Sequence, residues 1–359
     1  MFKVDSVDGN ARAGRLGTAH GLIETPFFMP VATKGAVKWV SNKELLEAGT
    51  ECIICNAYLF AMRPGLEAVE KAKGIHNFIG WQKGIFTDSG GFQTLNEQFL
   101  LNANEKGVFF RNPFDKSKQF LSPEKAIRIQ NALQSDAAMC LDDVPLHGSS
   151  AERLLESAER TSAWAQRCKQ AHENKKQLLF GICQGGLDKK LREKSAKEIA
   201  ALDFDGNAIG GLCIGENKAQ RDEMIKAANG IFPAEKPRYL MGVGTPKDIL
   251  EAIFLGVDAF DSCFPARVAR HGAAITGKGN LDISKGKFRQ DFSPIDRECG
   301  CFVCKNHSRA FLHHLLKVKE ENGQRLLSIH NISFVQSIVK EARAAIKEQR
   351  FGKMLKRFM

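Results

Sequence analysis

Three cysteines near the C-terminus have the spacing of metal ligands. Cys299, Cys301 and Cys304 fall within six residues, and His330 follows them. Three thiolates and one imidazole make up a tetrahedral zinc set, and four protein ligands leave no coordination position open for a substrate. We therefore predict one structural Zn²⁺ ion per chain and expect the chemistry of the protein to lie elsewhere.

Two aspartates in apolar, glycine-rich surroundings are the candidates for that chemistry. Asp88 stands in TDSGGFQ and Asp261 in VDAFDSCFPAR. A single aspartate at the end of a strand most often caps the next helix. Two carboxylates in one pocket, however, allow one to attack as a nucleophile while the other moves a proton. This division of labour breaks glycosidic bonds.

A further set of residues is suited to a planar base. Asp142 can accept two N–H bonds and Gln184 offers both a donor and an acceptor, which fits the edge of guanine or a related base. The glycine pairs at 185–186 and 210–211 let a flat ring approach the main chain. Phe92 and Met241 could then sandwich that ring, and ordinary core packing is the alternative reading of these two side chains.

The elements that must position these residues are eight apolar runs, separated by helical patterns. They are PFFMPVA, ECIICNAY, GIFTDSG, DAAMCLDD, LLFGICQGG, NAIGGLCIG, RYLMGVG and VDAFDSCF. Eight βα units over roughly 250 residues predict an α/β fold of the (β/α)8 TIM-barrel type. A doubly wound open sheet is the alternative, but no G-x-G-x-x-G follows the first strand.

In a TIM barrel the active site gathers at the carboxyl ends of the strands, here called the barrel mouth. The residues that end the eight runs should therefore face one another. They are Asn56, Asp88, Ser89, Asp142, Asp143, Gln184, Gly210, Gly211, Met241, Gly242 and Asp261. Asn56 is accordingly a further candidate for substrate binding.

The same patterns divide the chain into four parts: an N-terminal antiparallel layer (1–25), a catalytic barrel (26–275), a zinc-binding subdomain packed on the barrel (276–351) and a basic tail (352–359). We expect an insertion at about 92–121, after the third barrel strand. We expect two helices in the subdomain, at about 309–321 and 332–351.

The charge of the chain favours a polyanionic partner. Its formal net charge is +11 at pH 7, which invites nucleic acid, although an indifferent basic surface is the alternative. Residues 340–359 hold seven Lys or Arg against two Glu, which suits contacts with phosphates or a solvated helix face. No run of 18 apolar residues occurs, so we expect neither a membrane span nor a signal peptide, and a cytoplasmic protein.

Six motifs in order resemble tRNA-guanine transglycosylase, and the similarity extends from about Gly9 to Phe351. They are TDSGGFQ at 87–93, LDD at 141–143, CQGG at 183–186, GGLCIGE at 210–216, DAFDSCFPARVARHG at 258–272, and CGCFVC with the later IHNI. The resemblance implies that Asp261 attacks C1′ of the target ribose, expels guanine and leaves a covalent tRNA–enzyme intermediate. Asp88 matches the general acid/base, which deprotonates the incoming 7-deazaguanine.

Further roles follow from the same resemblance. The base-recognition positions match Asp142, Gln184, Gly211 and Leu212, with Ser89 and Glu216 nearby. The stacking pair matches Phe92 and Met241, and the RNA-binding positions on a loop after the nucleophile match Arg267 and Arg270.

Departures from the family pattern bear on the incoming base. Phe92 stands where bacterial members commonly have Tyr, so the stacking face is kept. Val144 replaces the usual bacterial Cys and resembles the queuine-using eukaryotic form, whereas Ile214 stands where that form has a small Gly. Because a branched side chain narrows the room for a cyclopentenediol, we favour the aminomethyl base preQ1 over queuine.

The resemblance also implies partners. Wobble guanine of tRNAs with GUN anticodons is the expected target, because the RNA-binding extension of archaeal enzymes is not seen. A homodimer is expected, with contacts from Phe311 and His314, although His307 replaces a common aromatic. A non-catalytic subunit, a relative that modifies DNA and a plain glycoside hydrolase are the alternatives. The non-catalytic subunit is disfavoured because Asp88 and Asp261 are both present, and the glycoside hydrolase is disfavoured because the surface is basic.

Overall fold

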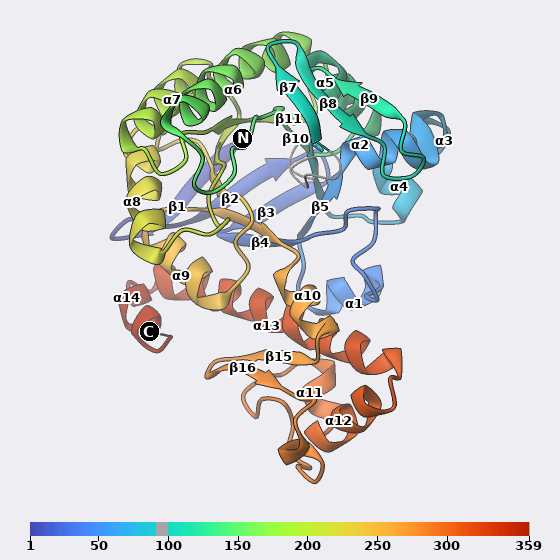
Figure 1. The fold of residues 1–359 in the computed structure, drawn as a ribbon. Helices are drawn as coiled ribbons and strands as arrows, with labels where there is room; N and C mark the ends of the chain where they lie inside the picture. Colours follow the sequence, from blue (N-terminus) through green and yellow to red (C-terminus); the bar gives the residue numbers. More distant parts are fainter. Residues whose placement is uncertain (91–99, 359) are drawn as a thin grey trace.

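The computed structural model describes residues 1–90 and 100–358. Its centre is a sheet of eight parallel strands: β4 (Phe27–Pro30), β5 (Cys52–Asn56), β6 (Gly84–Asp88), β10 (Ala137–Met139), β11 (Leu178–Cys183), β12 (Gly206–Ile209), β13 (Arg238–Leu240) and β14 (Ala259–Ser262). Their order is β4-β14-β13-β12-β11-β10-β6-β5, and a parallel bridge between Val31 and Ile54 joins the two end strands. The sheet closes into a barrel (Figure 1), so the predicted (β/α)8 fold is confirmed.

Helices connect the strands and surround the barrel (Figure 1). They are α1 (Asn42–Glu47), α2 (Ala57–Phe60), the π-helical turn η1 (Ala61–Gly65), α3 (Leu66–Lys71), α4 (Ile75–Ile79), α5 (Pro123–Leu133), α6 (Ala151–Ala171), α7 (Lys189–Ala201), α8 (Lys218–Asn229), α9 (Pro246–Phe254) and α10 (Phe264–Arg270). Local sequence explains several starts. Ser41 forms a capping box with Glu44, and Ser122 and Thr245 cap α5 and α9, which begin with proline.

Apolar side chains fill the barrel, and a small sheet closes its amino-terminal end. One buried cluster joins Phe86 and Tyr239 from the barrel strands to Leu16 and Ile23. The latter two come from the antiparallel sheet of β1 (Phe2–Asp8), β2 (Ala11–Thr18) and β3 (Gly21–Thr25). Ile23 lies against Gly84, the first residue of β6. The small sheet therefore leaves the barrel mouth, at the other end, as the end where a binding site can form.

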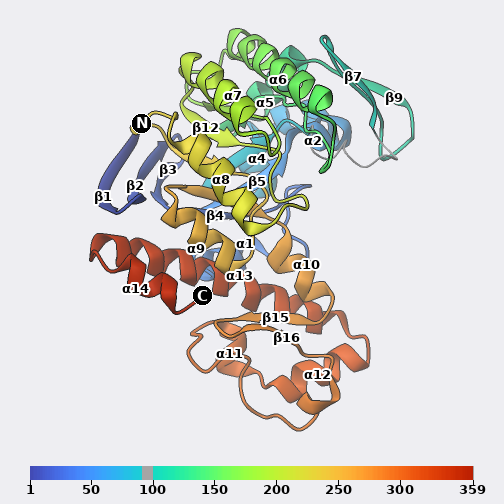
Figure 2. The same cartoon turned by 60° about the vertical axis from the view of Figure 1, so that its left-hand side comes forward.

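The insertion after β6 forms an antiparallel sheet of β7 (Leu100–Asn104), β8 (Gly107–Arg111) and β9 (Lys118–Leu121). Trp164 and Arg167 of α6 donate side-chain hydrogen bonds of 3.0 and 2.6 Å to the carbonyl of Glu105. These bonds fasten the turn between β7 and β8 to the barrel. Figure 2 shows this sheet on the side of the barrel opposite to β1–β3.

The C-terminal region contains the hairpin β15 (Ala273–Thr276) and β16 (Gly279–Asp282), the 3-10 turn η3 (Gly286–Phe288), and the helices α11 (Phe302–Asn306), α12 (Arg309–Lys317), α13 (Glu321–Lys347) and α14 (Phe351–Lys356). Helix α13 runs beneath the barrel and continues into the subdomain below it (Figures 1 and 2). It begins well before the predicted residue 332. The middle of the helix, including His330 and Asn331, is buried on every side, so its sequence shows no amphipathic stripe that would have indicated the earlier start.

The predicted basic tail is helical as far as Lys356, and Phe351, Met354 and Leu355 are buried. Within residues 1–90 and 100–358, no helix combines the length and the apolar character needed to cross a membrane.

Candidate active site and metal centre

Asp88 is the last residue of β6 and Asp261 the last but one of β14, so both lie at the barrel mouth. Oδ1 of Asp88 accepts a hydrogen bond of 2.9 Å from the amide of Gly90. Oδ1 of Asp261 accepts two bonds, of 2.6 Å from the hydroxyl of Tyr239 and of 2.9 Å from the amide of Gly242. Each carboxylate is thus oriented by groups of the protein while it remains partly open to solvent in the mouth.

The two carboxyls differ in proton affinity. Burial, and after it the negative charge of Asp261, raise the pKa of Asp88 to about 8. Burial also raises the pKa of Asp261, but the hydrogen bonds from Tyr239 and Gly242 oppose that rise. Asp88 is therefore mainly protonated near neutral pH and can act as an acid, whereas Asp261 has two donors that stabilise its ionised form.

Asp142 and Gln184 meet in the mouth as the sequence predicts. Nε2 of Gln184 donates a hydrogen bond of 2.7 Å to Oδ2 of Asp142. Burial raises the pKa of Asp142 to about 7, against the effect of that bond. Oε1 of Gln184 is buried and has no hydrogen-bond partner among the described residues. A buried acceptor without a donor is costly unless a ligand supplies one, so this amide is suited to the N–H groups of a base.

The glycines beside Gln184 are required by close packing. A Cβ at Gly211 would stand 2.3 Å from Oε1 of Gln184, and one at Gly210 would stand 2.5 Å from its Nε2. Gly211 also has a φ of +67°, which a side chain disfavours. The pair therefore makes room for the amide of Gln184.

Two residues that shape this site were not found by sequence reasoning. Tyr239 lies in a run that looks wholly apolar, and it orients Asp261. Arg192 of α7 is fully buried and donates hydrogen bonds of 2.8 to 2.9 Å to the carbonyls of Cys183, Gly186 and Gly210. It thus joins the loops after β11 and β12. The sequence did not indicate this role, because Arg192 occupies a regular position on an amphipathic helix.

Asp143 does not face the mouth, contrary to its place among the strand-end residues. Arg153 and Arg160 of α6 hold its carboxylate with hydrogen bonds of 2.5 to 2.8 Å, so it belongs to the packing of α6 on the barrel. Asn56 is at the mouth but serves as the N-cap of α2, accepting from the amide of Leu59 at 2.8 Å. Its Nδ2 is buried without a partner among the described residues.

The remaining predicted residues lie around this centre. Ser89 and Leu212 are buried, and Met241 packs half-buried against the barrel interior. Glu216 closes its own loop by accepting hydrogen bonds from the amides of Cys213 and Ile214. Phe92 lies outside the described residues.

The predicted RNA-binding arginines are not on a loop. Arg267 and Arg270 are exposed on helix α10, which begins with Pro265 in its first turn. The proline two residues into FPARVAR starts the helix rather than breaking it.

The four predicted metal ligands come together. Nδ1 of His330 lies 3.8 Å from Sγ of Cys299, 3.5 Å from that of Cys301 and 3.4 Å from that of Cys304. These separations fit one tetrahedral ion, because bonds of about 2.3 Å to sulfur and about 2.0 Å to nitrogen set such atoms about 3.5 Å apart. Nε2 of His330 lies 2.9 Å from the carbonyl of Ile275, which holds a proton on Nε2 and leaves Nδ1 free to bind the metal.

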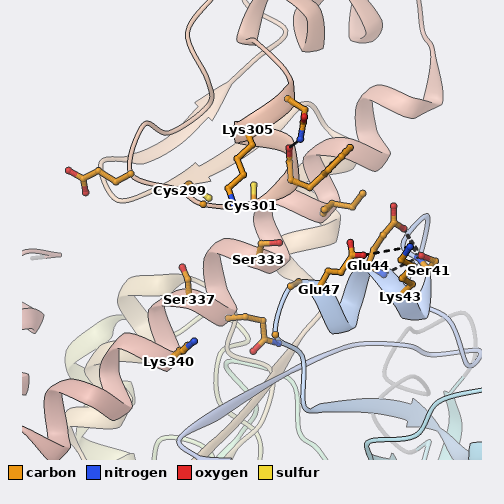
Figure 3. Close-up of a pocket in the computed structure, with 18 of the residues that line it drawn as sticks. Ser41, Lys43, Glu44, Glu47, Cys299, Cys301, Lys305, Ser333, Ser337 and Lys340 are labelled. Atoms are coloured by element: carbon orange, nitrogen blue, oxygen red, sulfur yellow. Dashed lines mark hydrogen bonds and ion pairs between the residues drawn. The ribbon is translucent and has the colours of Figure 1, made fainter.

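A surface cavity of about 1020 Å³ borders this cluster. Figure 3 shows it between α1, which carries Lys43 and Glu47, the loop with Cys299, and helix α13 with Lys340. Its lining contains none of the aspartates of the mouth. The cavity and the carboxylate centre are therefore separate features.

The chain is similar to known proteins over nearly its whole length. A family model described as TGT, queuine tRNA-ribosyltransferase, matches residues 7–359. The queuine tRNA-ribosyltransferase of Fusobacterium nucleatum subsp. nucleatum is 47% identical over 364 residues, covering 100% of this chain and 97% of the relative. That of Listeria innocua serovar 6a is 45% identical and covers 100% and 94%, and that of Halothermothrix orenii is 45% identical and covers 95% and 92%. The chain therefore belongs to the queuine tRNA-ribosyltransferase family of pentosyltransferases.

Proposed function

We propose that this protein exchanges the wobble guanine of tRNA for a 7-deazaguanine base, a step of queuosine biosynthesis. One observation carries the proposal: Asp88 and Asp261 lie at the same barrel mouth, where Tyr239 and Gly242 hydrogen-bond the carboxylate of Asp261. Burial, which raises the pKa of Asp88 to about 8, supports it. The buried edge of Asp142 and Gln184 supports a purine-like base as the group that is exchanged.

In the first half of the reaction, an oxygen of Asp261 attacks C1′ of the ribose. The bond from C1′ to the guanine nitrogen breaks, and its electron pair leaves with the base. Asp88, protonated near neutral pH, gives its proton to the departing guanine. The product is a covalent bond between Asp261 and the ribose, and Asp88 is left as a carboxylate.

In the second half, the carboxylate of Asp88 takes the proton from the corresponding nitrogen of the incoming base. That nitrogen attacks C1′, the bond to Asp261 breaks, and its electrons return to the carboxylate. Two displacements at C1′ retain the configuration of the ribose. Gln184 and Asp142 hold the base through N–H and C=O groups in both halves.

The preferred incoming base is preQ1. Ile214 is half-buried, and its amide donates a hydrogen bond of 3.1 Å to Glu216, in the loop that follows Gly211. A branched side chain at this position leaves less room for the cyclopentenediol of queuine than for an aminomethyl group.

The ion bound by Cys299, Cys301, Cys304 and His330 is proposed to be Zn²⁺ with a structural role. A set of soft thiolates and one imidazole suits this metal, and four protein ligands leave it no position for chemistry.

Arg267 and Arg270 are proposed to contact tRNA, because they are exposed on the helix that directly follows the nucleophile strand. A second copy of the chain is proposed to dock near Phe311 and His314. Phe311 is 40% exposed and stacks on His307 at 5.3 Å. Sedimentation of the wild type and of Phe311→Ala tests this contact, and a wild-type monomer would refute it.

Exchange of radiolabelled guanine into tRNA tests the central proposal. The wild type should incorporate label, and Asp261→Asn should reduce incorporation to background, because the amide cannot form the covalent bond. Full exchange by Asp261→Asn would refute the nucleophile assignment. Denaturing gels should show a tRNA adduct of the wild type and none of the variant.

The base is tested by competition. Release of label from guanine-charged tRNA is measured with preQ1, preQ0 and queuine at equal concentration. We expect preQ1 to displace the label fastest. Faster displacement by queuine would overturn the interpretation of Ile214.

A further inference from the structure

A group of cations surrounds one aromatic ring at the edge of the mouth. We call Lys34, Arg63, Arg111, Phe114 and Lys118 the insertion patch. Lys34 follows β4 and Arg63 follows β5, while the other three belong to the insertion after β6. Because β4, β5 and β6 are neighbours in the barrel, their carboxyl ends adjoin. The patch therefore lies on the same end as Asp88, the last residue of β6.

Two of the cations rest on the ring of Phe114. The guanidinium carbon of Arg63 lies 4.5 Å from the ring centre and Nζ of Lys34 lies 5.7 Å from it. Both side chains are exposed, and neither forms an ion pair within the described part of the chain. Stacking on an aromatic ring holds a cation without neutralising it. These two charges are thus oriented and still available to an anion.

The two strands beside Phe114 add a pair of like charges. Arg111 of β8 stands directly opposite Lys118 of β9 in the antiparallel register. Both are exposed, and no carboxylate of residues 1–90 or 100–358 pairs with either. Like charges at directly opposed positions of two strands destabilise the pair. An anionic ligand that binds between them would remove this cost.

Asp115, the carboxylate next to Phe114 in the sequence, does not cancel the patch. Asp115 accepts hydrogen bonds of 2.9 and 2.6 Å from the amide and hydroxyl of Ser117. These bonds, and to a smaller extent the charge of Arg63, lower the pKa of Asp115. The patch therefore carries four cations against one adjoining carboxylate, which is hydrogen-bonded within its own turn.

The placement of the patch indicates its ligand. Barrel strand β14, which carries Asp261 and leads into the helix of Arg267 and Arg270, is the other neighbour of β4. Cations thus follow β14, β4, β5 and β6 in turn, around the two catalytic aspartates. A chain of phosphates that crosses the mouth would meet positive charge on both sides of the reacting nucleotide.

We infer that the insertion patch binds the phosphate backbone of the RNA at the part of the mouth formed by β4, β5 and β6, next to the strand that leads into α10. The inference rests on the proposed function, since it takes tRNA as the substrate. Phosphate contacts position a nucleic acid without reading its sequence, so the patch would act on every substrate tRNA alike.

The double variant Arg63→Gln/Lys118→Gln tests the inference. Guanine exchange is measured against tRNA concentration at several salt concentrations. Loss of two phosphate contacts should raise KM for tRNA by about 10-fold and lower the slope of log affinity against log salt by about 1 to 2. The variant Arg63→Lys/Lys118→Arg, which keeps both charges, should restore most of the affinity and the slope.

The matched control is Lys175→Gln/Lys176→Gln. These lysines are exposed and precede β11, so they lie at the closed end of the barrel. This control should keep the wild-type KM and salt slope. An equal loss in both double variants would show a general effect of net charge and overturn the inference, as would an unchanged salt slope in Arg63→Gln/Lys118→Gln.

A direct binding measurement separates this inference from the proposed function. Fluorescence anisotropy of a labelled tRNA anticodon stem–loop gives affinity without turnover. If the wild type binds the RNA and the patch variant binds it more weakly, the patch is supported even when no exchange occurs. If exchange occurs but both bind alike, only the patch is refuted. Should the double variant fail to fold, Lys34→Gln serves the same measurement.

Discussion

The hydroxyl of Tyr239 donates a hydrogen bond of 2.6 Å to Oδ1 of Asp261. The two residues belong to neighbouring parallel strands, β13 and β14, and Tyr239 is fully buried. The bond orients the carboxylate of Asp261 and favours its ionised form. Burial acts in the opposite direction and raises the pKa of Asp261. Tyr239 thus positions the carboxylate that we propose as the nucleophile.

Tyr239→Phe should therefore shift the acid limb of the pH profile of kcat/KM. Removal of the donor leaves Asp261 harder to ionise, so the limb moves to higher pH. A hydrogen bond to a charged group contributes about 1.5–3 kcal/mol, and partial exposure of Asp261 places the effect at the lower end, about one pH unit. Exchange rates from pH 5 to 9 measure the shift.

Tyr58→Phe is the matched control, because the hydroxyl of Tyr58 points to Gln119 of the insertion at 3.4 Å. Its acid limb should stay at the wild-type pH. A Tyr239→Phe profile that also stays there, with only a lower rate, would show that Tyr239 packs the barrel without tuning Asp261.

Asp88→Asn should stabilise the fold at alkaline pH while it abolishes turnover. In the unfolded chain an aspartate titrates near 3.9, whereas the pKa of Asp88 in the folded protein is about 8. Between these values the folded state binds more protons than the unfolded state, so this carboxyl makes the protein less stable as the pH rises. The melting temperature of the variant should match the wild type near pH 4 and exceed it at pH 9.

The comparison for this prediction is Asp115→Asn. The pKa of Asp115 is lowered by its hydrogen bonds to Ser117, so ionisation of this group does not penalise folding. Thermal melts at pH 4, 7 and 9 should show no gain for Asp115→Asn at high pH. Equal melting temperatures of Asp88→Asn and the wild type at pH 9 would contradict the raised pKa.

Much of the barrel, and the position of Asp88 and Asp261 at its mouth, could be predicted, because the information is local. Each barrel strand is an apolar run, and the residue that ends a run must lie at the mouth, as Asp88 and Asp261 do. Three other features depend on distant partners. Asp143 ends a run in the same way, but Arg160 of α6 turns its carboxylate aside. The hydroxyl of Tyr239 meets Asp261, and Arg192 meets Gly210, only after the barrel closes.

Gly211→Ala should weaken binding of the base. The added Cβ would stand 2.3 Å from Oε1 of Gln184, so the amide must move away from Asp142. Misplacing one buried hydrogen-bonding group costs about 1–3 kcal/mol, which corresponds to an increase in KM for guanine of about 5- to 150-fold. KM for tRNA should change much less, because no phosphate contact is involved.

Gly277→Ala is the control for that substitution, since a Cβ at Gly277 would meet no atom within 4 Å. It should leave both KM values at the wild-type level. A Gly211→Ala protein that raises KM for guanine and for tRNA equally would indicate a general distortion of the mouth, against a specific role of the Gln184 amide.

Removal of the proposed Zn²⁺ ion should unfold the C-terminal subdomain and spare the barrel. The four ligands join the loop of Cys299 to Cys304 with His330 on α13, and His330 also contacts Ile275 of β15. Without an ion, three thiols and an imidazole crowd one point with no bond to hold them. Hydrogen exchange after chelation should therefore increase in residues 273–320, while β10 to β13 stay protected. Trp81 and Trp164, both buried, report whether the barrel remains folded.

Cys304→Ala should lose one equivalent of zinc by mass spectrometry and weaken tRNA binding, whereas Cys263→Ser, at an exposed cysteine outside the cluster, should keep the metal. A chelated protein with unchanged protection and full tRNA affinity would refute the structural role, and the assignment of Asp261 would not be affected.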